Sequence, residues 1–189
     1  MEAARTGSCI AYTCHGPERF DVTTSDGLRL ATDVYLPATS AGPVSGPLPA
    51  LLERTPYSRR RPFLVQTARY FTRRGYAVVL QDVRGRFDSE GTWNFLTAAE
   101  GPDGVATIDW IASQPWSDGR VATMGLSFST ANQQALAVHR PAGLVAQCLF
   151  EGGYSYFHRT VRHAGAFELG VMLPYAYRTG LEQNTIRED

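Results

Sequence analysis

The chain has 189 residues, of which 43% are hydrophobic, so its size and composition suit about one globular domain with an ordinary core. Its 18 basic and 18 acidic residues give a formal net charge of zero, which argues against the basic surface of a nucleic-acid-binding protein. Three cysteines are too few for a disulfide framework, and Cys9, Cys14 and His15 have no second pair of ligands at zinc-site spacing.

Residues 1–16 predict a loosely attached N-terminal leader. This stretch lacks the apolar segment of a secretory signal, and no segment of the chain has the roughly 20 apolar residues that a membrane-spanning helix needs. We therefore expect a cytoplasmic protein with free thiols and with no metal, cofactor, membrane or nucleic-acid partner.

A β-hairpin is the next predicted element. Two extended runs in residues 20–37 flank Asp26-Gly27, a dipeptide typical of hairpin turns, and the second run alternates in the period of a strand. Residues 38–47 are rich in Gly, Pro and Ser and predict a loop. The consecutive arginines Arg59, Arg60 and Arg61 are expected to lie in a solvated loop.

Short apolar strands then alternate with amphipathic helices. Strands are predicted at 49–53, 76–82, 117–125 and 144–151, and helices at 63–75, 103–115 and 129–140. This alternation predicts an α/β fold with a mainly parallel sheet, flanking helices and the hairpin at one edge. The strand at 144–151 is expected to leave an unpaired edge open to self-association. Beyond it we expect a helix around 157–171, no further strand and a polar tail.

Ser127 lies at the predicted junction between the strand at 117–125 and the helix at 129–140. A sharp turn from strand to helix exposes one side chain at the end of the sheet and requires small neighbours, as in the pattern G-x-S-x-G. Here Gly125 fits the pattern and Ser129 replaces its second glycine. Two interpretations stay open at this point: Ser127 is a catalytic nucleophile, or it is only the N-cap of the helix.

Four stretches carry a resemblance to a known family. They read SDGLRLATDVYLP, LLERTPYSRR, GYAVVLQDVRGRFDSEG and DGVATIDWIASQPWSDGRVATMGLSFS, and they cover about residues 20–155 in order. In this combination the sequence resembles the N-terminal half of CocE/NonD hydrolases, the cocaine-esterase and X-Pro dipeptidyl-peptidase type of serine hydrolase. The resemblance implies an α/β-hydrolase sheet truncated after about the sixth strand, with residues 17–155 in the hydrolase domain and 156–189 at the start of a helical cap.

The resemblance also implies roles for three residues. Ser127 matches the nucleophile that becomes acylated, Tyr57 in R-T-P-Y matches a hydroxyl donor of the oxyanion hole, and Phe128 matches the residue whose backbone N–H is the second donor. Tyr57 follows the strand at 49–53, in the loop where this fold places an oxyanion donor. The alternative for Tyr57 is an ordinary aromatic residue of a surface loop.

Departures from the family pattern leave the activity open. Phe128 stands where the family has tyrosine, and Thr130 replaces a glycine, which is expected to distort the turn. A serine nucleophile also needs a histidine and a carboxylate, which in this fold follow later strands. None of His139, His158 and His163 follows a predicted strand, so we expect the triad Asp and His to be missing from this stretch.

Two functions follow from these observations. The first is a serine hydrolase that cleaves small ester or peptide substrates through an acyl-enzyme on Ser127, with its site completed by a second chain or left incomplete. The alternative is a catalytically inactive hydrolase remnant that binds a ligand or a partner through its unfinished sheet.

Overall fold

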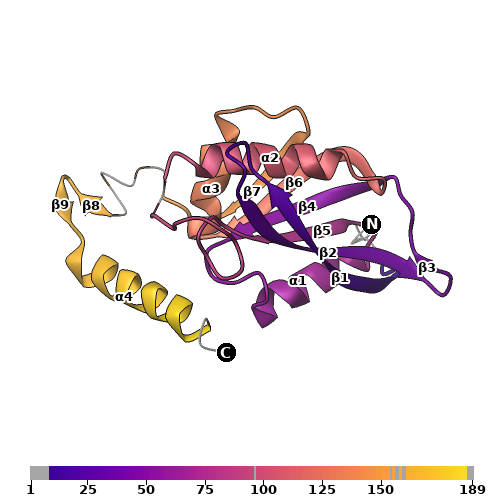
Figure 1. The fold of residues 1–189 in the computed structure, drawn as a ribbon, viewed down its shortest axis with the longest axis horizontal. Helices are drawn as coiled ribbons and strands as arrows, with labels where there is room; N and C mark the ends of the chain where they lie inside the picture. Colours follow the sequence, from indigo (N-terminus) through magenta and orange to yellow (C-terminus); the bar gives the residue numbers. More distant parts are fainter. Residues whose placement is uncertain (1–8, 96, 154, 156–157, 159–160, 187–189) are drawn as a thin grey trace, which may run out of the picture.

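The structure is a computed structural model that describes residues 9–95, 97–153, 155, 158 and 161–186, with side chains described as far as Leu181 (Figure 1). The strands are β1 (Thr13–Thr23), β2 (Arg29–Thr39), β3 (Gly42–Pro43), β4 (Leu48–Thr55), β5 (Ala77–Asp82), β6 (Ser117–Leu126), β7 (Leu144–Phe150), β8 (Arg162–His163) and β9 (Ala166–Phe167). The helices are α1 (Pro62–Thr72), α2 (Glu100–Ala112), α3 (Phe128–Ala137) and α4 (Leu169–Ile186). This order confirms the predicted alternation of strands and helices from β4 to β7.

One mixed sheet organises the molecule, with the strand order β1-β2-β5-β4-β6-β7 and with β3 paired to β2. The neighbours β5–β4, β4–β6 and β6–β7 are parallel, whereas β1, β2 and β3 join in antiparallel fashion. The predicted α/β-hydrolase type of sheet is therefore confirmed. Within the described residues β7 has a neighbour on one side only, as predicted for an edge strand.

The N-terminal hairpin is confirmed, but its first strand is longer than predicted. β1 and β2 pair around the turn at Asp26-Gly27, and β1 already begins at Thr13. The expectation of a leader over 1–16 is therefore wrong for residues 13–16, and residues 1–8 lie outside the described part. The predicted loop at 38–47 contains the short strand β3, which extends the hairpin to a third strand.

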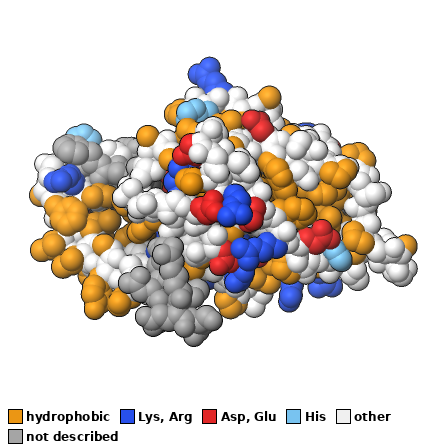
Figure 2. Space-filling view, in the orientation of Figure 1, with side chains coloured by type: hydrophobic (Ala, Val, Ile, Leu, Met, Phe, Trp, Pro, Cys, Tyr) orange, Lys and Arg blue, Asp and Glu red, His pale blue; other side chains and the backbone are white. Residues whose placement is uncertain are grey.

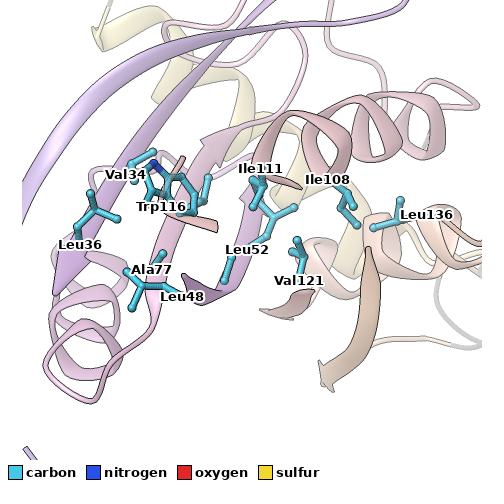
Figure 3. Close-up of a cluster of buried hydrophobic side chains, with 12 residues drawn as sticks. Val34, Leu36, Leu48, Leu52, Ala77, Ile108, Ile111, Trp116, Val121 and Leu136 are labelled. Carbon is cyan, nitrogen blue, oxygen red and sulfur yellow. The ribbon is translucent and has the colours of Figure 1, made fainter. Parts of the chain in front are cut away.

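Helices cover both faces of the sheet, α2 and α3 on one side and α1 on the other (Figure 1). Figure 3 shows the larger core, in which Ile108 and Ile111 of α2 and Leu136 of α3 pack against Leu52 and Val121 of the sheet. Burying each such side chain stabilises the fold by roughly 2 kcal/mol. β4 contributes to both cores through Leu52 and Leu51, and β6 packs into the larger one through Val121, so these strands are held by packing.

The C-terminal segment differs from its prediction. In place of a helix around 157–171 with no further strand, the described residues form the small β8–β9 hairpin and then α4, which runs on to Ile186. α4 contains Pro174 in its interior, together with Gly170 and Gly180, and these residues disfavour helix in isolation. Tertiary contacts of α4 with the body, described below, outweigh these local preferences.

Exposed hydrophobic side chains gather on this C-terminal segment. Figure 2 shows them over α4 and the β8–β9 hairpin, at the left of the view. They are Phe167, Leu169, Val171, Leu173, Tyr177 and Leu181. An apolar surface of this kind is uncommon on a monomeric protein and suits a segment that contacts another surface.

The expectation of a solvated arginine run is wrong for Arg59. Its side chain is 1% exposed, and it donates hydrogen bonds to Asp33, Asp82 and Asp88. Arg60 remains exposed and donates to Oδ2 of Asp88, the same oxygen that Arg59 bonds. Runs of charged residues usually lie on the surface. Arg59 is buried here because charge-assisted hydrogen bonds to three carboxylates near β2 and β5 offset the cost of burying its charge.

Candidate active site

Ser127 occupies a sharp turn between β6 and α3. β6 ends at Leu126, α3 begins at Phe128, and Ser127 between them has φ 59° and ψ −114°. A positive φ is strained for a residue with a side chain and costs about 1–3 kcal/mol. Strain of this kind persists only where the surrounding structure enforces it, as at the nucleophile turn of an α/β-hydrolase.

Close packing explains the small residues beside Ser127. A Cβ atom at Gly125 would collide with the Cβ of Ser129, so only glycine fits where the strand end meets the helix. Thr130 was expected to distort the turn. Instead, its hydroxyl oxygen lies within hydrogen-bonding distance of two carbonyl oxygens, that of Gly125 at 2.9 Å and that of Phe150 at 2.7 Å, and its single proton can be donated to either. Thr130 thus ties the turn to the end of β7.

The Ser127 side chain is exposed and directed toward Tyr57. Ser127 is the N-cap residue of α3 by position, but its side chain makes no capping hydrogen bond. Its hydroxyl oxygen instead lies 3.3 Å from the hydroxyl oxygen of Tyr57. This geometry argues against the interpretation of Ser127 as only a cap, because a cap needs its oxygen turned back to the helix.

Tyr57 is held by the loop that follows β4. Its backbone N–H donates to Oγ1 of Thr55 at 3.1 Å, and the guanidinium carbon of Arg61 lies 5.2 Å from the centre of its ring. Its hydroxyl lies between two others, with that of Tyr175 from α4 also at 3.3 Å. The alternative of an isolated surface aromatic does not fit these contacts.

Phe128 is buried and its backbone begins α3. The ring packs on Trp93 and Phe95, with centroids 6.2 and 5.6 Å away. The N–H groups of a first helical turn have no acceptor within the helix and lie at the positive end of its dipole. Phe128 thus directly follows Ser127 at this end of α3, while the Tyr57 hydroxyl lies 3.3 Å from the Ser127 hydroxyl.

A pocket of about 360 Å³ opens beside this hydroxyl. Its walls include Ser127, Tyr57, Glu53, Leu64, Tyr175 and Arg178. Ligand pockets of proteins begin at about this size, so a small molecule fits. The pocket joins the carboxyl ends of β4 and β6 to α1 and α4, where open α/β sheets bind ligands.

Glu53 is a feature of this pocket that the sequence analysis missed. Its side chain is 6% exposed, and burial raises the pKa of its carboxyl from 4.5 to about 7. No charged or hydrogen-bonding partner of this carboxyl is found among the described residues. The signal in the sequence was a single acidic residue in an otherwise apolar run, PALLE. Tyr175 was missed as well, because only the packing of α4 brings it to the site.

Two of the histidines considered for the base, His139 and His163, have contacts elsewhere in the described structure. His139 lies beyond the end of α3 and against Gly101 of α2, while His163 is exposed and bonds to Glu168 at 2.8 Å. In the described part of the chain, the hydroxyl of Ser127 meets Tyr57 and no histidine. That none of His139, His158 and His163 serves as the base stays a prediction.

The described residues contain no group of three or more His, Cys, Asp or Glu side chains that could hold a metal ion. Within the same part of the chain, no helix combines the length and apolar character needed to cross a membrane.

Fold and turn together define an α/β-hydrolase. Residues 26–188 match the family model described as X-Pro dipeptidyl-peptidase (S15 family), and the chain belongs to that family. It is 40% identical over 129 residues to cocaine esterase from Rhodococcus sp. (strain MB1 Bresler), which covers 66% of this chain. The chain spans 21% of the length of that esterase.

Solved structures agree on the fold. An aminopeptidase from a marine sediment archaeon, Thaumarchaeota archaeon, has a TM-score of 0.75 at 27% identity, over 89% of this chain and 30% of its own. A CocE/NonD family hydrolase from Staphylococcus aureus has a TM-score of 0.77 at 20% identity, over 90% of this chain and 33% of its own. The chain is therefore similar to one part of larger hydrolases of the CocE/NonD type.

Proposed function

We propose that the chain carries the nucleophile and oxyanion hole of a serine hydrolase that cleaves small ester or peptide substrates through an acyl-enzyme on Ser127. The observation that carries this proposal is the strained turn that exposes the Ser127 hydroxyl 3.3 Å from that of Tyr57. The family supports a hydrolase in general terms, and the pocket supports a small substrate.

In this proposal the oxygen of Ser127 attacks the substrate carbonyl, and the carbonyl oxygen becomes negatively charged. The Tyr57 hydroxyl and the Phe128 N–H donate hydrogen bonds to that oxygen. One donor of this kind stabilises the transition state by about 3–4 kcal/mol. The tetrahedral intermediate then expels the alcohol or amine, which takes up the proton released by Ser127, and water hydrolyses the acyl-serine to the free acid and Ser127.

The reaction also needs a proton acceptor for Ser127. Because the histidines of the described residues do not contact Ser127, the acceptor in this proposal is a group outside the described contacts, supplied by another part of the protein or by a second chain. The lack of a described histidine contact with Ser127 also favours the alternative function, an inactive module that only binds a ligand or a partner. The two differ in whether Ser127 is reactive.

Labelling with a fluorophosphonate separates them. The purified chain is treated with the probe, and the modified residue is located by peptide mass spectrometry. The expected result is one modification on Ser127 that is lost in Ser127→Ala and retained in the control Ser113→Ala, which changes an exposed serine at the end of α2. A folded chain that takes up no label would instead support the binding module.

A further inference from the structure

Tyr175 extends the pair Ser127–Tyr57 to a row of three hydroxyl groups. Its hydroxyl oxygen lies 3.3 Å from that of Tyr57, which in turn lies 3.3 Å from that of Ser127. The two phenol rings meet nearly at right angles, 87°, with centroids 6.5 Å apart. Edge-on packing fixes the ring of Tyr175 as well as its hydroxyl.

Arg86 fastens the helix of Tyr175 to the loop of Tyr57. This side chain is fully buried, and its guanidinium donates to the carbonyl oxygen of Pro56 at 2.7 Å and to that of Thr179 at 2.8 Å. Pro56 directly precedes Tyr57, and Thr179 lies one helical turn after Tyr175. One cation therefore holds both backbones that carry the phenols, with charge-assisted bonds that are stronger than neutral ones.

Phe95 adds a second link between α4 and the donors. Its ring packs on Tyr175 and on Phe128, with centroids 5.7 and 5.6 Å away. Of the two residues of the proposed oxyanion hole, Tyr57 thus contacts Tyr175 directly, and Phe128 contacts it through the ring of Phe95. α4 is part of the pocket wall through these contacts and not only through its apolar surface.

The single proton of each phenol decides what Tyr175 can do. Tyr57 can donate to a charged oxygen beside Ser127 only if it does not donate to Tyr175. If Tyr175 donates to Tyr57, the proton of Tyr57 is left for the substrate side, and the accepted bond makes Tyr57 a stronger donor. We propose that Tyr175 is a positioning residue that directs the hydroxyl of Tyr57 toward the oxyanion.

This inference rests on the proposed function, and a double-mutant cycle tests it in the full chain. The second-order rate of fluorophosphonate labelling of Ser127 is measured in the unchanged chain, Tyr57→Phe, Tyr175→Phe and the double variant. The expected result for Tyr175→Phe is a 3- to 10-fold slower rate, the size of one neutral hydrogen bond. The loss should appear in the bond-forming step and not in probe affinity.

In the Tyr57→Phe background, Tyr175→Phe should cost nothing further, because no hydroxyl proton remains to be directed. The control is Tyr177→Phe, which removes a hydroxyl from the same helix at a side chain that is 69% exposed, and it should leave the rate unchanged. A merely structural role of Tyr175 would slow labelling equally in both backgrounds.

The outcomes separate this inference from the proposed function. Labelling that slows equally in both backgrounds, or not at all, overturns the role of Tyr175 while Ser127 remains reactive. A folded chain without any label overturns the proposed function and this inference with it. Melting curves of the four variants identify any variant that loses rate through unfolding.

Discussion

Two of the clusters of buried polar side chains on this sheet differ in how their hydrogen bonds are satisfied. Around Arg59 the carboxylates of Asp33, Asp82 and Asp88 all receive hydrogen bonds from one guanidinium, and Asp82 also accepts the backbone N–H of Arg59 at 2.7 Å. In the pocket beside Ser127, Glu53 has no partner among the described residues, and the buried hydroxyl of Ser129 has none either.

The difference separates scaffold from site. Buried polar groups are normally satisfied within the protein, because an unpaired one costs about 1–3 kcal/mol. The Arg59 cluster follows this rule. Its hydrogen bonds connect β2, β5 and the loop after β5. The pocket breaks the rule where its groups face a cavity that a ligand can enter. Unsatisfied bonds next to a strained serine are therefore a better guide to function than burial or charge alone.

The largest effect is expected when the Arg59 cluster is broken. Arg59→Met should lower the free energy of unfolding by about 3–5 kcal/mol, because it leaves the buried carboxylates of Asp33 and Asp82 without their cation. The exposed neighbour Arg60 is the matched control, since it bonds to the same Asp88. Arg60→Met should cost less than about 1 kcal/mol. Urea unfolding measures both, and equal losses would contradict the distinction.

A second substitution breaks the site without touching the scaffold. Tyr57→Phe removes the hydroxyl that faces Ser127 and should slow fluorophosphonate labelling about 100-fold or more, the effect of one oxyanion donor. Its urea midpoint should stay close to that of the unchanged chain. Tyr70→Phe, on the exposed surface of α1, is the control for loss of a phenol hydroxyl. Fast labelling of Tyr57→Phe would remove Tyr57 from the mechanism.

The buried carboxyl of Glu53 should make the free energy of unfolding depend on pH. Its pKa is about 7 in the folded chain and 4.5 ordinarily, so the folded state binds more protons between these values and stability falls as pH rises from about 4.5 to 7. Glu53→Gln should abolish this fall and stabilise the chain by about 3 kcal/mol at pH 8, with little change at pH 4. Urea midpoints at the two pH values test this. A gain of equal size at both would contradict the raised pKa.

The smallest expected effect concerns the strain at Ser127. Ser127→Gly should be about 1 kcal/mol more stable than Ser127→Ala, because glycine adopts φ near 59° without steric cost whereas alanine keeps the Cβ. Thermal unfolding of the two variants measures the difference. An alanine variant as stable as the glycine variant would show that the turn is not strained.

Much of the scaffold was predictable because its signals are local. The hairpin turn at Asp26-Gly27, the apolar strands β5 and β7 and the strand–serine–helix order around Ser127 each follow from a few adjacent residues. The predicted pairing of Tyr57 with Ser127 came from family resemblance, since 70 residues separate the two along the chain.

The rest depends on tertiary contacts that no local pattern carries. α4 forms despite Pro174 and two glycines, because Arg86, Phe95 and Tyr57 hold it from outside. Arg59 is buried because carboxylates distant in sequence converge on it. Glu53 could have been noticed as an acidic residue in an apolar strand, but its lack of a partner is visible only in three dimensions.

The carbonyl of Phe150, the last residue of β7, accepts the Ser127 N–H at 3.0 Å and the Thr130 hydroxyl at 2.7 Å. The backbone amide of Ser127 is thus hydrogen-bonded to the edge strand β7. This amide should exchange with deuterium only when the end of β7 separates from the turn. A molecule that binds along β7 should therefore slow hydrogen exchange at Ser127.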